Sequence, residues 1–227
     1  MMRALILMLM LATPAGAGDC VVLLHGLARG PASMAPLGWA LGRAGYRVVN
    51  LGYPSIEAPV EALAAHVGRA VAACGAERVH FVTHSMGGIV LRQWLTRHRP
   101  ANMGRVVMLA PPNQGSELVD AWGDLAVFGW VNGPAGRQLG TGPDSLPRRL
   151  PAVDVPVGVI AGRLTTNPVS AQILPGPDDG KVSVAATHVA GEADHWVVAA
   201  THTFIMLNPG VIRQVKTFLA TGAFSRR

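Results

Sequence analysis

The chain has 227 residues, a length typical of one globular domain. Half of its residues are hydrophobic and 14% are charged, which excludes an intrinsically disordered chain and supplies enough apolar side chains for a sizeable core. The formal net charge is +6, but the basic residues are scattered and form no stripe with interleaved aromatic residues, so we expect no nucleic acid as a partner. A weak attraction to acidic membrane surfaces is the expected consequence of this charge.

The first 17 residues have the three regions of a secretory signal peptide. Arg3 gives a positive start, residues 4–12 are uninterruptedly apolar, and residues 15–17 read Ala-Gly-Ala. The apolar run has about nine residues, whereas roughly twenty are needed to span a bilayer, so we predict cleavage near Ala17 and no membrane anchor. We expect an exported, monomeric domain of residues 18–227, periplasmic or secreted.

The predicted export of the chain bears on the state of its two cysteines, Cys20 and Cys74. An isolated pair in an oxidising compartment is often bridged. Cys20 would open the first mature strand and Cys74 would close a helix before a neighbouring strand, which favours a disulfide over two buried thiols. Attachment of a lipid to Cys20 is the weaker alternative, because Asp19 occupies a position where such signals prefer a small residue.

Short apolar runs alternate with helical patterns from residue 20 onward. Runs that are apolar throughout are typical of strands buried on both faces of a parallel sheet. We predict strands at Cys20–Leu24, Arg47–Leu51, Val79–Thr83, Arg105–Leu109 and Pro156–Ala161, with a weaker sixth near Thr187–Ala190.

The segments between these strands predict helices at Ser33–Arg43, Glu57–Cys74, Met86–His98 and Asn208–Leu219. Asn208 is a good N-cap residue for the last helix, and Pro209 suits its first position. Strand–helix alternation of this kind predicts an α/β fold, with a mostly parallel, doubly wound sheet of about six strands.

Residues 111–151 interrupt the alternation. They are rich in glycine and proline, yet they carry Trp122, Phe128 and Trp130. A stretch this long inside a compact domain usually forms a functional insertion. We predict a small cap or lid, whose three aromatic side chains bind substrate or pack the cap onto the core.

The strongest chemical signal is the segment from Thr83 to Gly88, which reads Thr-His-Ser-Met-Gly-Gly. It follows an apolar strand and opens a helix, the context in which G-x-S-x-G places a serine in a strained turn above a sheet. Thr83 replaces the first glycine of that pattern, which tightens the packing beneath the turn. Because a serine hydroxyl is a weak nucleophile, Ser85 needs this exposure together with a neighbouring base.

A second signal, His25-Gly26-Leu27, lies at the end of the first mature strand. In this kind of fold the loop at that place supplies one backbone N–H to an oxyanion hole, and the residue after the nucleophile supplies the other. The pattern nominates the amides of Leu27 and Met86. We expect His25 itself to be structural.

The orienting acid and the base should follow the serine in that order along the chain. We select Asp179, in a polar turn after the fifth predicted strand, with Asp178 as its adjacent competitor. Asp154 precedes that strand and lies at its wrong end. Asp194 falls late for the usual loop, although its histidine neighbour keeps it a candidate.

Three histidines follow the acid. The base should lie in the loop before the last helix, and His202 is the nearest histidine to the start of that helix at Asn208. His195 is the serious competitor for the role of base. The other interpretation of His195 is that of a loop histidine paired with its neighbour Asp194. We expect His188 to lie within or beside the last strand.

The mature region resembles small bacterial lipase-like hydrolases in the lipase and carboxylesterase branch of the α/β-hydrolase superfamily. Some of these are similar to the glycosylphosphatidylinositol deacylase family. The resemblance is carried by VVLLHGL (21–27), HFVTHSMGG (80–88), LAPPNQGSE (109–117), PGPDDGKVSV (175–184) and THTFIMLNP (201–209).

The resemblance implies an α/β-hydrolase fold with Ser85 as nucleophile, Asp179 as acid and His202 as base. It implies cleavage of a small-molecule or lipid ester through an acyl-enzyme, without a metal or an organic cofactor. A phospholipase, thioesterase or acyltransferase using the same three residues is the first alternative. The second is a catalytically silent hydrolase-fold domain used for binding.

Overall fold

The computed structural model describes residues 18–75 and 77–226, so the expected signal peptide lies outside the described residues. Six strands form a single sheet in which every neighbouring pair is parallel. The spatial order is β2 (Arg47–Leu51), β1 (Cys20–Leu24), β3 (Val79–His84), β4 (Met103–Leu109), β5 (Val157–Gly162) and β6 (Asp194–Val198). The predicted parallel, doubly wound α/β sheet is therefore confirmed.

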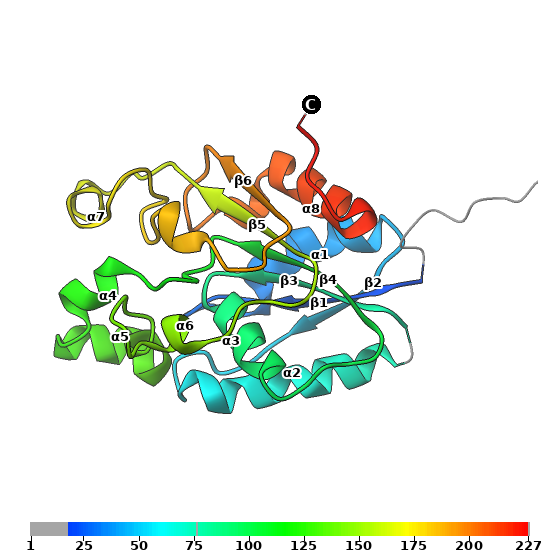
Figure 1. Cartoon of the computed structure of the whole chain (residues 1–227), viewed down its shortest axis with the longest axis horizontal. Coiled ribbons are helices and arrows are strands. Elements are labelled where there is room, and N and C mark those ends of the chain that lie inside the picture. Colours follow the sequence, from blue (N-terminus) through cyan, green and yellow to red (C-terminus); the bar gives the residue numbers. More distant parts are fainter. Residues whose placement is uncertain (1–17, 76, 227) are drawn as a thin grey trace, which may run out of the picture.

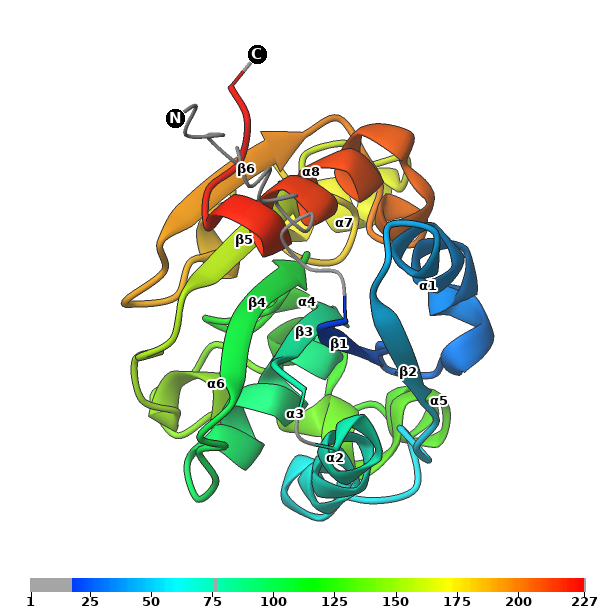
Figure 2. The same cartoon turned by 90° about the vertical axis from the view of Figure 1, so that its right-hand side faces the viewer.

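Helices cover both faces of this sheet, and each face has its own core (Figures 1 and 2). Strands β1 and β3 are fully buried because their apolar side chains point alternately into the two cores. One face is covered by α1 (Ala35–Gly42) and α8 (Pro209–Thr221), and the other by α2 (Val60–Cys74) and α3 (Met86–Leu95).

The sixth strand differs from the prediction. It is β6, which pairs with β5 through His195 opposite Val159 and Val197 opposite Ala161. The segment near Thr187–Ala190 is instead a turn, closed in part by the Thr187 hydroxyl donating to the Val184 carbonyl at 2.7 Å. As an edge strand, β6 is only half-buried, so it lacks the continuous apolar run that identified the inner strands.

Residues 111–151 contain three helices, α4 (Glu117–Trp122), α5 (Ala126–Arg137) and α6 (Leu146–Arg149). Figure 1 shows α4 and α5 beyond one end of the sheet rather than on either face. The remaining short elements are η1 (Pro31–Met34), α7 (Pro168–Ile173), η2 (Ala185–Thr187) and η3 (Ile205–Leu207).

Cys20 and Cys74 form the predicted disulfide, which joins the start of β1 to the end of α2 across a Cα–Cα distance of 5.7 Å. The bond leaves no free thiol at Cys20 for a lipid. Within residues 18–75 and 77–226, none of the helices combines the length and the apolar character that crossing a bilayer requires.

Candidate active site

The candidate site lies at the carboxyl ends of the strands, where ligands bind in open α/β sheets. Because all six strands run in the same direction, the loops that leave β1, β3, β5 and β6 emerge at one edge. Leu27 follows β1, Ser85 follows β3, Asp179 lies in the segment after β5, and His202 follows β6. Residues far apart in the sequence thereby become neighbours.

Ser85 lies in a sharp strand-to-helix turn between β3 and α3. Its backbone has φ 52° and ψ −128°, a conformation that L-residues rarely adopt and that costs about 1–3 kcal/mol. Its N–H donates to the Leu109 carbonyl of β4 at 2.8 Å, which holds the strained residue in place. A Cβ atom on Gly87 would lie 2.6 Å from the Leu24 carbonyl oxygen, so the first turn of α3 packs against β1 only with glycine there.

Thr83, the departure from the usual glycine, is fully buried beneath this turn. Gly88 provides the compensating space, because a Cβ atom on it would lie 3.3 Å from the Thr83 hydroxyl and 3.3 Å from Pro111. The second of the two glycines after the serine therefore makes room for the larger residue before it.

The structure brings Ser85, His202 and Asp179 into one hydrogen-bonded chain. His202 Nε2 lies 2.9 Å from Ser85 Oγ, and His202 Nδ1 lies 2.8 Å from Asp179 Oδ2. A carboxylate only accepts, so Nδ1 carries the proton and Nε2 is free to accept from the serine hydroxyl. This is the geometry of a nucleophile, a general base and an orienting acid.

The Asp179 carboxylate is buried, and its second oxygen is also occupied. Oδ1 accepts from the N–H groups of Lys181 at 3.0 Å and Val182 at 2.9 Å. The Asp179 carbonyl additionally accepts from the His202 N–H at 2.9 Å, which joins the two loops through their backbones. These contacts fix the Asp179 carboxylate in place, so that it can hold the imidazole in one tautomer.

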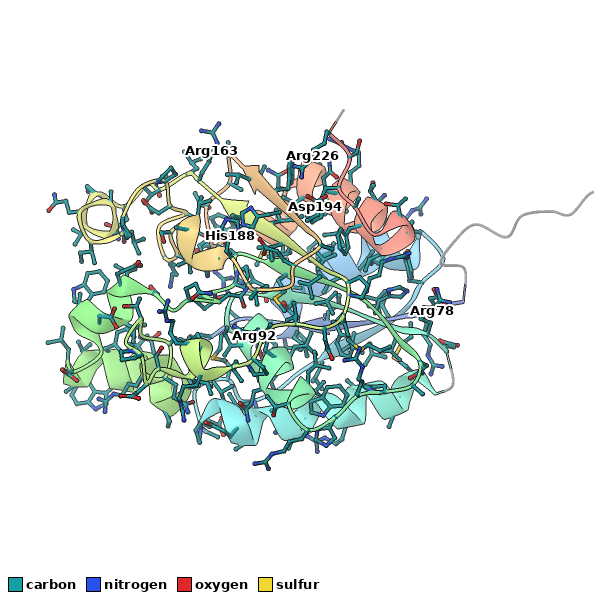
Figure 3. All side chains as sticks on the ribbon, in the orientation of Figure 1. Arg78, Arg92, Arg163, His188, Asp194 and Arg226 are labelled. Atoms are coloured by element: carbon teal, nitrogen blue, oxygen red, sulfur yellow. A yellow bond between two sulfur atoms is a disulfide. The ribbon has the colours of Figure 1, made fainter. Side chains whose placement is uncertain are left out.

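The competing residues lie elsewhere. Asp178 accepts from the Gly180 N–H at 2.7 Å and stabilises its own turn. Asp194, the first residue of β6, pairs with Arg226 near the C-terminus (Figure 3). Asp154 pairs with Arg99 at the opposite end of the sheet.

His188 and His195 are also outside the candidate site. Their rings stack on each other with centroids 3.9 Å apart, and neither lines the cavity that contains Ser85. His195 lies within β6 rather than in the loop that follows it, which is why it cannot take the position that His202 occupies.

Leu27 and Met86 occupy the positions expected of oxyanion-hole residues. Met86 is the first residue of α3, where a backbone N–H has no partner within the helix, and Leu27 lines the cavity beside Ser85. Gly26 permits the close approach, because a Cβ atom on it would lie 3.1 Å from the Ser85 Cβ atom.

His25 is buried beneath this loop and stacks on Tyr53 with ring centroids 4.1 Å apart. The Tyr53 hydroxyl donates to the His25 carbonyl, and His25 Nδ1 donates to the Gly26 carbonyl at 2.9 Å. Burial lowers the pKa of His25 and so favours its neutral form. These contacts hold the β1 loop in shape.

His84 is a residue whose role the sequence did not reveal. It precedes Ser85, is buried, and donates from Nε2 to the His202 carbonyl at 2.9 Å. Its pKa is lowered well below the usual value, first by burial and then by the charge of nearby His202. A neutral His84 thus anchors the backbone of the candidate base.

The cavity above Ser85 has a volume of about 270 Å³. Most of its apolar lining comes from the cap insertion, and two of the three predicted aromatic residues, Trp122 and Phe128, belong to it. Trp130 differs from the prediction: it is 81% exposed and outside the cavity lining, to which α5 contributes Phe128 and Val131 instead.

Among the residues that the structure describes, one group could supply three metal ligands: His188, Glu192 and His195. Their potential ligand atoms lie within 4.8 Å of one another. The group is apart from Ser85, and the cavity lining contains no aspartate or glutamate.

Solved structures share this architecture. The mature lipase BlEst2 of Bacillus licheniformis superposes with a TM-score of 0.71 at 20% identity, covering 92% of this chain and 94% of that one. The metagenomic carboxyl esterase MGS0156 gives 0.67 at 21% identity, covering 83% and 66%. Phospholipase PlaB of Legionella pneumophila gives 0.61 at 20% identity, covering 75% and 45%. At these identities the similarity shows the fold.

A comparison with curated protein sequences finds no match. A family model described as the α/β-hydrolase fold, however, matches residues 19–165, from the first strand to just beyond β5. That span includes the strand–serine–helix turn and the cap. The chain therefore belongs to the α/β-hydrolase fold family.

Proposed function

We propose that the protein is a serine hydrolase that cleaves carboxylic esters through an acyl-enzyme on Ser85. The observation that carries this proposal is the hydrogen-bonded chain from Ser85 Oγ through His202 to Asp179, at the floor of a largely apolar cavity. Lipases and esterases among the solved structures with this fold support the choice of an ester substrate.

In the proposed reaction, His202 Nε2 takes the Ser85 proton as the serine oxygen attacks the ester carbonyl. The amides of Leu27 and Met86 stabilise the oxyanion, and protonated His202 then gives its proton to the leaving alcohol. A water molecule, deprotonated by the same histidine, attacks the acyl-enzyme and releases the acid. Trp122 and Phe128 pack against the acyl chain.

The test is mass spectrometry of the protein after reaction with a fluorophosphonate, with the adduct mapped to its peptide. We expect one adduct, on Ser85, that is lost in Ser85→Ala and His202→Ala. The matched control is His195→Ala, which removes a histidine outside the cavity and should keep the adduct. Labelling that survives Ser85→Ala, or that depends on His195, overturns the assignment.

We also propose that the protein is exported. The signal-peptide pattern of residues 1–17 and the Cys20–Cys74 disulfide both support an oxidising compartment. The intact mass of protein from the periplasm and from the medium tests this. A mature chain that begins near residue 18 is expected, and a full-length chain confined to the cytoplasm would contradict export.

A further inference from the structure

Two cations face the cavity that contains Ser85. Arg29 comes from the loop after β1, two residues beyond Leu27, and Lys181 comes from the turn that carries Asp179. No aspartate or glutamate lines this cavity. Within residues 18–75 and 77–226, neither cationic side chain forms a hydrogen bond or an ion pair with another residue.

Asp179 offsets these two charges only in part, because it is a single carboxylate beside two cations and makes no ion pair with either. Its carboxylate already accepts three hydrogen bonds, from His202 and from two backbone amides. Lys181 is exposed to solvent, yet desolvation by the neighbouring residues lowers its pKa, and Arg29 lowers it further, whereas Asp179 acts in the opposite direction. Lys181 is therefore a cation that its surroundings disfavour and that an added anion would stabilise.

The apolar part of the cavity has a different origin. Most of its apolar side chains come from the cap and include Leu118, Trp122 and Phe128, whereas both cations come from loops at the edge of the sheet, which also contribute Leu27 and Val182. An ester bound at Ser85 can place its acyl chain against the cap and its alcohol beside the cations. The volume of about 270 Å³ is near the lower limit of about 300–1,000 Å³ for ligand pockets, which suits a short or medium acyl chain.

We propose that Arg29 and Lys181 select esters whose alcohol carries an anionic group, a phosphate or a carboxylate. This inference rests on the proposed function, because it assumes that Ser85 attacks the ester. The two side chains are specificity-determining residues: they bind the anion and take no proton in the reaction. Arginine can bind such an anion through two parallel hydrogen bonds, and lysine binds it as a point charge.

The experiment compares three soluble substrates with the same acyl chain: 1-octanoylglycerol, its 3-phosphate, and the octanoyl ester of lactate. The readout is the ratio of kcat/KM for each anionic ester to that for the neutral ester. We expect a ratio of about ten or more, equivalent to about 1.4 kcal/mol of transition-state binding, that decreases at high salt because ions screen the attraction. The phosphate and carboxylate substrates show which anion the site prefers.

Arg29→Gln and Lys181→Gln should each lower this ratio severalfold, and the double substitution should bring it close to one. Lys216→Gln is the matched control, because it removes the same charge from α8, outside the cavity lining, and should keep the ratio. Fluorophosphonate labelling of Ser85 in each variant shows that the site is intact.

Two results would overturn the inference, and they are distinguishable. A wild-type ratio near one, or a ratio that neither substitution changes, would show that Arg29 and Lys181 do not select anionic esters. The proposed hydrolysis of esters at Ser85 would still stand. Absence of both ester hydrolysis and Ser85 labelling overturns the proposed function, and the selectivity with it.

Discussion

Asp178 and Asp179 are adjacent in the sequence, yet their carboxylates have different partners. Asp179 accepts from His202 Nδ1 at 2.8 Å, whereas Asp178 accepts from the Gly180 N–H at 2.7 Å and remains within its own turn. Both side chains are buried. One position along the chain therefore separates a residue that orients the candidate base from one that stabilises a loop.

Asp179→Asn should lower kcat for ester hydrolysis by about 10³–10⁴-fold, because a neutral amide neither stabilises the imidazolium nor fixes the required tautomer of His202. Asp178→Asn is the matched control and should cost roughly 1 kcal/mol of stability with little change in kcat. Steady-state kinetics and urea unfolding of both variants provide the measurements. Equal losses of kcat in the two variants would contradict the assignment of the acid.

The lowered pKa of His84 predicts that the stability of the protein depends on pH. Its pKa is lowered in the native protein, chiefly by burial, so below about pH 6.5 the unfolded chain binds a proton that the native chain does not. The free energy of unfolding therefore decreases as the pH falls, by at most about 1.4 kcal/mol per pH unit from this residue.

His84→Gln should remove this contribution, so that the free energy of unfolding changes less between pH 7 and pH 5 than in the wild type. Urea unfolding at several pH values measures the slope of stability against pH for both proteins. A slope in His84→Gln equal to that of the wild type would show that His84 is not the group responsible.

At the scale of elements, one buried arginine attaches the cap insertion to the core. Arg92 of α3 donates to the Asn113 carbonyl at 3.1 Å and to the Leu150 carbonyl at 2.9 Å, at the two ends of the insertion. Burial lowers the pKa of Arg92 to about 10. The guanidinium group has enough N–H donors, spread over a planar fork, to bind both ends at once. The donors of a lysine ammonium all lie on one nitrogen atom and cannot reach both ends in the same way.

Arg92→Lys should lower the free energy of unfolding by about 2–4 kcal/mol, because carbonyl groups at one end of the cap lose their donor while a charge stays buried. Arg97→Lys, at an exposed position just beyond α3, is the matched control and should change stability by about 0.5 kcal/mol or less. Urea unfolding measures both. Equal stability of the two variants would show that Arg92 does not anchor the cap.

At the scale of the whole molecule, the disulfide and Ser85 lie at opposite ends of the sheet. The disulfide joins the amino end of β1 to the end of α2, whereas Ser85 lies at the carboxyl end of β3. The fully buried strands between them form a rigid connection. Changes at the disulfide should therefore affect unfolding more than the geometry around Ser85.

Reduction of the disulfide should lower the free energy of unfolding by about 4 kcal/mol, the loop-entropy value for its sequence separation of 54 residues. Urea unfolding with and without a reducing agent measures this change. The rate of fluorophosphonate labelling at 25 °C should stay the same in the reduced, still folded protein. Loss of labelling without unfolding would contradict the separation of the two ends.

Several features of the fold could be predicted because their signals are local. The four inner strands are largely apolar runs, the edge strand β2 contains a shorter one, and Asn208 with Pro209 marks the start of α8, where the Asn208 side chain accepts from the Gly210 N–H at 2.8 Å. The prediction for the sixth strand is wrong because β6 begins with Asp194 and His195 and therefore lacks the apolar run by which the other strands are identified. Trp130 was misplaced because hydrophobicity does not show which side of a cap helix faces the cavity.

The sequence by itself predicted the parallel sheet and the strained turn at Ser85, and it favoured the pairing of Cys20 with Cys74. These follow from short-range patterns and from the compartment that the N-terminus implies. Only the tertiary structure decided which acid and which histidine meet the serine, because hydrogen bonds over more than a hundred residues depend on the order of strands in the sheet. It also decided that Arg29 and Lys181 face the same cavity, since the direction of a loop side chain depends on packing that no local pattern records.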